Sequence, residues 1–134
     1  MEYSVVRSDD VDRVDMDEMT DGLIQPDVRR IQAELDADDV VANLWYFDED
    51  EAIVHHEHER QEEVYLVVEG EFEVKFGAAG DTDVERVEEG DVFRAAAGVP
   101  HGHKCLSQRG VIFAVGAPNV TDVNPETYTP YDEA

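Results

Sequence analysis

The hydrophobic positions of the chain fall into short segments that are rich in β-branched and aromatic residues. Glycine, aspartate or proline separates each segment from the next, as is typical of strands joined by turns. Helical periodicity is poor along the chain. The pattern therefore predicts an all-β protein, with strands within residues 3–7, 40–47, 52–58, 63–70, 71–76, 83–87, 91–96 and 110–118.

The segment EFEVKF, residues 71–76, alternates most clearly between apolar and charged residues. Successive side chains of a strand point to opposite faces, so Phe72, Val74 and Phe76 are expected to share one face and the three charged residues the other. The sequence AAGDTD, which follows at 78–83, has the residues of a hairpin or short loop. This region is the clearest strand prediction in the chain.

Three other stretches are less regular. Residues 26–39 begin with Pro-Asp and fit either a short helix or a further strand, and the strand is favoured. Residues 8–22 indicate a surface arm or a loosely packed edge, and residues 119–134 an extended C-terminal tail. No linker is long enough to separate two folding units, so residues 1–134 are expected to form one domain.

The charge of the chain is strongly one-sided, with 34 acidic against 10 basic residues and a formal net charge of -24. A disordered acidic tail is a poor explanation, because the acids are spread along a chain that is 42% hydrophobic. A second explanation, an acidic face that binds a basic partner, is compatible with the sequence. We favour an adaptation to a salt-rich cytoplasm, because the balance resembles that of proteins from extreme halophiles. Binding to nucleic acid is not expected, since phosphates would be repelled.

The expected location is the cytoplasm, without a membrane anchor. The N-terminal sequence lacks a basic start followed by an apolar run, and no stretch approaches the roughly 18 apolar residues of a membrane span. Cys105 is the only cysteine, so no intrachain disulfide can form. The fold must depend on packing and on any metal that the chain binds.

Three of the five histidines lie within four positions, in the sequence IVHHEHERQEEVYLVVEG of residues 53–70. The cluster is either a solvated polar turn or half of a metal site. In a strand, His56 and His58 would share one face while His55 and Glu57 point the other way. A hairpin would then bring Glu63 alongside the two imidazoles.

The remaining histidines, His101 and His103, follow a Gly-Val-Pro bend and would share a face with Cys105 in a strand. All five histidines therefore lie in two short segments. Three imidazoles and one carboxylate are a plausible ligand set for a borderline metal ion.

The spacing of these residues resembles the two sequence motifs of the cupin family. The first motif, G(X)5HXH(X)3-4E(X)6G, is matched from His56 to Gly70, although Asp50 replaces its first glycine. The second motif, G(X)5PXG(X)2H(X)3N, is matched at three positions but has two replacements. The matched positions are Gly90, Gly98 and His101, and the replacements are Ala96 for proline and Cys105 for asparagine.

The resemblance implies a double-stranded β-helix, the small jelly-roll barrel of cupins, with its core at about residues 42–117. It also implies one divalent transition metal inside the barrel, either Fe, Mn, Ni, Co or Zn. A homodimer is the assembly that it implies, with residues 1–20 and 119–134 as arms that could be exchanged between subunits. The ligands that the resemblance assigns are His56, His58, Glu63 and His101.

Other residues near this site have weaker assignments. His103 is the first choice for a proton-transfer residue and Tyr65 the second. His103 could also be a fifth ligand or a hydrogen-bond donor to a ligand, but a partly exposed histidine without a role is as plausible. Cys105 is expected to be a small buried residue and not a nucleophile. His55 is expected at the surface or at an interface.

Two classes of function follow from these residues. The first is a metal-dependent enzyme acting on a small, oxygen-rich substrate that chelates the metal, with oxygenase chemistry ahead of isomerase or decarboxylase chemistry. The second is a sensory or binding barrel that holds a metal or a small molecule without turnover, because a fold does not determine an activity. The sequence names no substrate for either.

Overall fold

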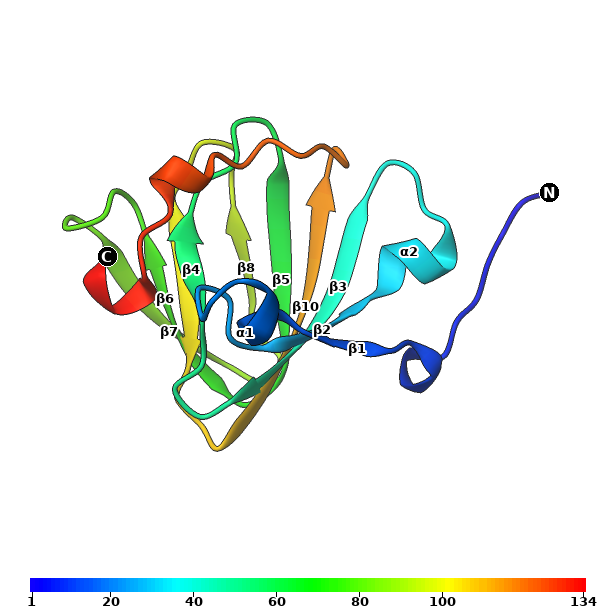
Figure 1. The fold of residues 1–134 in the computed structure, drawn as a ribbon, viewed down its shortest axis with the longest axis horizontal. Coiled ribbons are helices and arrows are strands. Elements are labelled where there is room, and N and C mark those ends of the chain that lie inside the picture. Colours follow the sequence, from blue (N-terminus) through cyan, green and yellow to red (C-terminus); the bar gives the residue numbers. More distant parts are fainter.

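A computed structural model describes all residues from 1 to 134 and contains two antiparallel sheets that face each other (Figure 1). The six-stranded sheet has the order β1-β2-β3-β10-β5-β8. Its strands are β1 (Arg13–Asp15), β2 (Asp27–Arg30), β3 (Val41–Asp48), β10 (Arg109–Ala117), β5 (Glu62–Glu69) and β8 (Val92–Ala95). The four-stranded sheet has the order β4-β9-β6-β7, from β4 (Ala52–His56), β9 (His101–Cys105), β6 (Glu71–Phe76) and β7 (Asp83–Glu88).

This arrangement is a jelly roll, a double-stranded β-helix, so the predicted all-β barrel is confirmed. Consecutive strands repeatedly cross from one sheet to the other, as from β4 to β5 and from β8 to β9. The crossings enclose the space between the sheets and create a rim where the chain turns. Functional side chains at strand ends can therefore meet across this rim.

The core between the sheets consists of inward-facing residues from both of them. Phe72 and Val74 are fully buried, and Phe76 packs against the core from a partly buried position, which confirms the alternation predicted for β6. Burial of such side chains contributes about 1.5–3 kcal/mol each. The cluster comprises Phe47, Ile53, Tyr65, Val67, Phe72, Val74, Phe93, Cys105, Ile112 and Ala114.

Helical structure is confined to short pieces, and none of these helices reaches the length and apolarity that a membrane span requires. The helices are α1 (Met16–Met19) and α2 (Ile31–Leu35), with 3-10 turns at Ser8–Asp10, Pro125–Thr127 and Tyr131–Glu133. Residues 26–39 contain both a strand, β2, and a helix, α2, where either one or the other was expected. Val28 is buried in the strand and Ile31 in the helix, and Asp36 ends the helix with a φ of 56°.

The two ends of the chain differ in how they meet the barrel. Within the segment expected to be an arm or edge, β1 pairs with β2 at the edge of the larger sheet. Figure 1 shows the first residues extending away from the barrel, whereas the C-terminal segment, in orange to red, crosses the rim and returns along β4. Thr129 exchanges two backbone hydrogen bonds with His55 of β4, so this segment is packed against the barrel.

Candidate metal centre

The four proposed ligands come from strand ends on both sheets. His56 is the last residue of β4 and lies opposite His101, the first residue of β9. His58 follows two residues after His56. Glu63 lies near the start of β5, in the other sheet, so it faces the histidines across the barrel and does not pair alongside them in a hairpin as expected. The polar link at 57–61 makes the crossing, because it turns at the rim from one sheet to the other.

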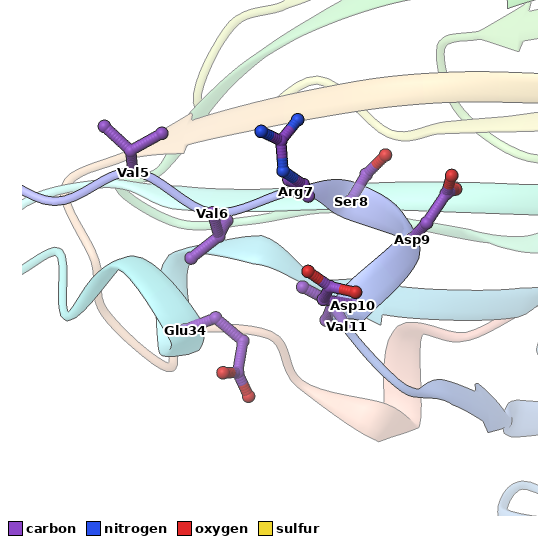
Figure 2. A pocket seen from close by; sticks show the side chains of 8 residues that line it. All are labelled: Val5, Val6, Arg7, Ser8, Asp9, Asp10, Val11 and Glu34. Atoms are coloured by element: carbon purple, nitrogen blue, oxygen red, sulfur yellow. The ribbon is translucent and has the colours of Figure 1, made fainter.

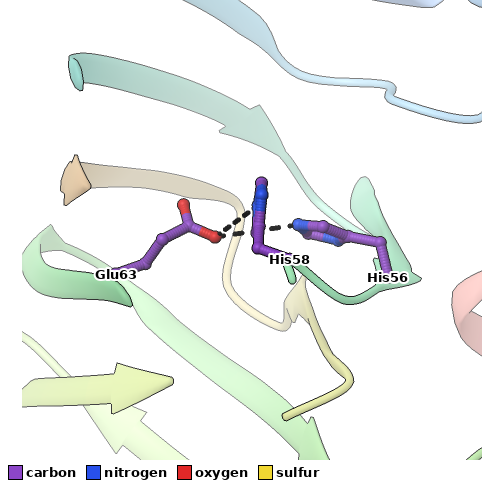
Figure 3. Close-up of side chains that lie close together, drawn as sticks. All are labelled: His56, His58 and Glu63. Carbon is purple, nitrogen blue, oxygen red and sulfur yellow. Dashed lines mark ion pairs between the residues drawn. The ribbon is translucent and has the colours of Figure 1, made fainter. Parts of the chain in front are cut away.

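The imidazoles converge on one carboxylate oxygen, as Figure 3 shows for His56, His58 and Glu63. Glu63 Oε1 lies 2.8 Å from His58 Nε2 and 3.8 Å from His56 Nε2. The Nε2 atom of His101 lies 3.2 Å from the same oxygen. One potential ligand atom from each of His56, His58 and Glu63 lies within 4.8 Å of the others, so this group could hold a metal ion.

Each imidazole is oriented by a hydrogen bond on its other nitrogen. His56 Nδ1 donates to the carbonyl of Val54 at 2.7 Å, and His101 Nδ1 donates to the carbonyl of Val99 at 2.9 Å. His58 Nδ1 donates to the carboxylate of Asp122 at 2.9 Å. Because these oxygens only accept, Nδ1 carries the proton and Nε2 of a neutral ring presents a lone pair.

These lone pairs face the anionic oxygen of Glu63. Because all of these atoms are electron-rich, a cation between them would stabilise the arrangement. A cation can be a metal ion, or protons added to the imidazoles. Three imidazole nitrogens and one carboxylate oxygen, with each ring fixed from behind, are the donor set of a divalent transition metal. The residues present therefore fit the metal that the family resemblance implies. We name His56, His58, Glu63 and His101 the polar cluster.

The electrostatic surroundings keep the Glu63 carboxylate ionised. Burial raises the pKa of Glu63, but the imidazoles of His101, His56 and His58 beside the carboxylate outweigh it and hold that pKa well below its usual range. Burial likewise lowers the pKa of His58, yet the carboxylates of Glu63 and Asp122 outweigh it and raise that pKa. The carboxylate of Glu63 is thus ionised and available as a ligand at neutral pH.

A cavity of about 220 Å³ opens beside the polar cluster. Its walls are mainly apolar, and it contains neither lysine nor arginine. Two of its polar residues, Asn43 and His103, have buried polar atoms without a hydrogen-bond partner. The lining residues are Ile24, Val41, Asn43, Trp45, Ile53, Val54, His56, His58, Gln61, Glu63, Tyr65, His103, Val123 and Tyr128.

Figure 2 shows a second hollow, of about 730 Å³, between residues 5–11 and Glu34 of α2. It is more open to solvent and is lined by the side chains of Arg7, Ser8, two aspartates, three valines and Glu34. It contains no histidine, cysteine or aromatic ring. The chemistry that the sequence predicted therefore gathers at the smaller cavity.

His103 lies beside the polar cluster but in different surroundings. It is 1% exposed, so the alternative of a partly exposed histidine is wrong. Burial lowers its pKa to about 3, and neither ring nitrogen has a hydrogen-bond partner. We name its setting the aromatic cage, formed by rings whose centroids lie 5.2–6.3 Å from that of His103: Tyr65, Phe47, Phe93 and Phe72.

Tyr65 joins the aromatic cage to the polar cluster. Its hydroxyl donates to His101 Nε2 at 2.9 Å, and its ring stacks on Phe93 at 4.6 Å. Burial raises the pKa of this hydroxyl, so it stays a neutral donor. The hydroxyl of Tyr65 and a metal ion would use the same lone pair of His101.

Two further expectations from the sequence have opposite outcomes. Cys105 is fully buried, with its thiol near the carbonyl of Ser107, as expected of a small core residue. The surface position expected for His55 is wrong, because that residue is 3% exposed and its Nε2 donates to the carbonyl of Gly77 at 2.7 Å. The C-terminal segment covers the edge of β4 at His55, and this coverage was not foreseen.

Sequence reasoning missed three residues that the C-terminal segment brings to the site. Asp122 binds His58, while Val123 and Tyr128 line the cavity. No motif marks Asp122. The apolar residues Val123, Tyr128 and Tyr131 were the only available signal that this acidic tail packs against something.

The sequence comparison agrees with this geometry. The chain matches the family described as "Cupin domain" over residues 43–115, more than half of its length. The protein therefore belongs to the cupin domain family. No significant match is found among curated proteins.

Solved structures with the same fold include three that illustrate its range. KdgF from Halomonas sp. is 25% identical with a TM-score of 0.70, and the match covers 87% of this chain and 96% of that one. An RmlC-like cupin from Shewanella frigidimarina is 22% identical with a TM-score of 0.66, covering 88% and 95%. A mutant of Bacillus subtilis oxalate decarboxylase is 15% identical with a TM-score of 0.69, covering 88% of this chain and 30% of that one.

Proposed function

We propose that the protein is a metal-dependent enzyme that acts on a small, oxygen-rich substrate. The observation that carries this proposal is the convergence of three imidazole Nε2 atoms on Glu63, with every Nδ1 fixed by a protein oxygen. A divalent transition metal at this position supplies Lewis acidity toward a carbonyl or enol oxygen and, for redox-active ions, oxidation chemistry. Oxygenase chemistry is our first choice, ahead of isomerisation or decarboxylation.

The cavity supports a restricted class of substrate. It contains no lysine or arginine that would balance a phosphate or a second carboxylate. A neutral or singly charged molecule with two neighbouring oxygens suits these walls, since its apolar part would contact Trp45, Ile53 and Val54. Those walls also keep water away from the reacting atoms.

Two residues are proposed to act on the substrate beside the metal ligands. Tyr65 is a neutral donor whose hydroxyl already reaches the polar cluster. His103 is neutral, lines the same cavity and has no protein partner for either nitrogen. With a pKa of about 3 this imidazole stays neutral, so its proposed part is to take a proton from a substrate transiently and return it.

Element analysis of tag-free protein purified in high salt tests the metal site. We expect close to one Fe, Mn, Ni, Co or Zn per chain, and none in a His56→Ala, His58→Ala double variant. Glu59→Ala is the control, because it removes an exposed acid next to the same segment. Failure of the wild type to retain metal after reconstitution would contradict the proposal.

The metal found then selects the activity assay. Oxygen uptake with a candidate diketone or flavonol is the assay for Fe, Mn, Ni or Co, and isomerisation or hydrolysis is the assay for Zn. A His103→Phe variant that retains the metal but loses turnover would support the proposed proton transfer.

A binding protein without turnover is the second candidate. It is favoured by the burial of His103, because both nitrogens are inaccessible to solvent in the aromatic cage. Metal and ligand binding without any turnover would support this candidate. The homodimer that the resemblance implies stays a prediction, which the molar mass in solution tests.

A further inference from the structure

Residues 118–134, named here the C-terminal strap, lie outside the matched family region and cross the rim of the barrel toward β4 (Figure 1). Val123 forms an isolated antiparallel β-bridge with His58 through the backbone, and Thr129 exchanges two backbone hydrogen bonds with His55. Val123 and Tyr128 also line the cavity. The strap is therefore part of the wall of the site.

Asp122 makes the closest link between the strap and the polar cluster. One carboxylate oxygen accepts the proton of His58 Nδ1 at 2.9 Å. The other accepts the backbone N–H groups of Arg60 and Gln61, at the turn that carries His58 toward β5. The side chain is only 5% exposed, so these three donors satisfy a buried charge.

His58 differs in this respect from the other two histidines. His56 and His101 bond to carbonyls two residues earlier in their own segments, so their orientation follows from local backbone structure. His58 lies beyond the last residue of β4, and its partner is 64 residues away in sequence. Its orientation depends on whether the strap is docked.

The far end of the strap is held by the only two lysines of the chain. Lys75 Nζ lies 2.8 Å from the carbonyl of Tyr131 and 3.2 Å from that of Ala134. Lys104 forms an ion pair with Asp132 at 2.9 Å. The Tyr131 hydroxyl adds a hydrogen bond to Glu73 at 2.8 Å. Both lysines thus hold three residues of this segment, Tyr131, Asp132 and Ala134.

We propose that Asp122 is a positioning residue for His58, and that docking of the C-terminal strap and metal binding stabilise each other. The inference rests on the proposed metal site. Carboxylates that hold a metal-binding histidine typically contribute 10–100-fold to metal affinity. Because coupling between two binding events is reciprocal, the metal stabilises the docked strap by the same factor.

Competition between the protein and a chromophoric chelator for Zn²⁺ tests the inference with the full chain. We expect Asp122→Asn to raise the Zn²⁺ dissociation constant by roughly 10–100-fold. Asn cannot accept from His58 and from both backbone N–H groups at once, because one of its two polar atoms is a donor. Glu126→Gln is the matched control, since it makes the same chemical change at an exposed position of the strap, and we expect no change from it.

Imidazole ¹⁵N spectra of the metal-free proteins separate positioning from a general loss of structure. At a pH where the imidazoles are neutral, we expect wild-type His58 to carry its proton on Nδ1 and the Asp122→Asn variant to lose this preference, while His56 and His101 keep theirs. Amide exchange over residues 119–133 should slow on addition of Zn²⁺ in the wild type and respond less in the variant.

The outcomes distinguish this inference from the proposed function. Wild-type binding with an unchanged dissociation constant in Asp122→Asn would overturn the inference and leave the metal site intact. No Zn²⁺ binding by the wild type would overturn the proposed function and the inference with it. Spectra in which all three histidines change together would show unfolding and would also contradict a specific role for Asp122.

Discussion

The polar cluster and the aromatic cage each contain a histidine that is at least partly buried, and the pKa values of these two histidines are shifted in opposite directions. In the polar cluster, carboxylates next to His58 overcome burial and raise its pKa. In the aromatic cage, His103 has aromatic rings around it and no hydrogen-bond partner, and burial lowers its pKa to about 3. The two imidazoles both line one cavity.

The comparison shows that burial alone does not determine what a histidine does. Desolvation acts against the charge on both residues, and the difference comes from the hydrogen-bond partners. His58 has an acceptor on each nitrogen, while His103 has none on either. A single barrel thus contains a group of side chains that could hold a cation and, beside it, a neutral imidazole.

The largest expected effect is unfolding of the whole protein at low salt, which would disrupt the polar cluster and the aromatic cage together. With a net charge of -24, the folded chain repels itself in dilute buffer, and molar salt shortens that repulsion to about 3 Å. We expect unfolding on dialysis into dilute buffer and recovery in molar KCl, followed by circular dichroism. An unchanged spectrum across this range would contradict the halophilic interpretation.

A His103→Phe variant tests the aromatic cage by itself. Because the folded state binds fewer protons than the unfolded state between pH 6.5 and about 3, His103 makes the wild type lose stability as pH falls through this range. The loss is about 1.4 kcal/mol per pH unit once the unfolded histidine is protonated. We expect the variant to lose less stability between pH 6 and pH 4.

Urea unfolding of both metal-free proteins in high salt measures this difference. Carboxylates also titrate in the same range, but they do so in both proteins, so the comparison isolates His103. Parallel stability curves for the two proteins would show that His103 is not held neutral by the aromatic cage.

A Lys75→Met, Lys104→Met double variant is expected to weaken docking of the C-terminal strap by a smaller amount. It tests the polar cluster indirectly, because the strap carries Asp122. Exposed ion pairs contribute up to about 1 kcal/mol and hydrogen bonds to a charged group about 1.5–3 kcal/mol, so we expect a loss of roughly 1–2 kcal/mol in strap docking. Amide exchange near Thr129 should accelerate by roughly 5–30-fold. The Zn²⁺ dissociation constant should rise only a few-fold, because Asp122 remains.

Arg86→Met is the control for this variant, since Arg86 is an exposed cation on β7 without an ion pair. It changes the net charge without touching the strap. Because this control removes one positive charge and the double variant two, an exchange effect at least half as large from the control would attribute the result to net charge and not to the two lysines.

Much of the candidate site was predictable, because spacing along strands and position at a bend carry geometric information. The resemblance to the two motifs implied that His56 and His101 lie near one another, and the burial of Phe72 follows from alternation. The sheet to which the strand of Glu63 belongs was not predictable. Alternation of apolar and polar residues describes one strand and does not show which sheet the next strand joins. For that reason a crossing between sheets was taken for a hairpin.

The contacts of the site with the C-terminal segment were also not predictable from the sequence. Asp122 is one of 34 acids, and nothing local distinguishes it from an exposed neighbour such as Glu126. The burial of His55 has the same origin, since it depends on backbone pairing with Thr129. Residues far apart in sequence meet there through tertiary packing, which no short motif encodes.

The scarcity of lysine gives the chain a built-in reporter. An amine-selective reagent has only Lys75, Lys104 and the N-terminal amine to modify, and both lysine amines hold the strap. Their rate of labelling therefore follows how often the strap leaves the barrel. Mass spectrometry of native protein could follow opening of the metal centre in this way, without introducing any foreign probe.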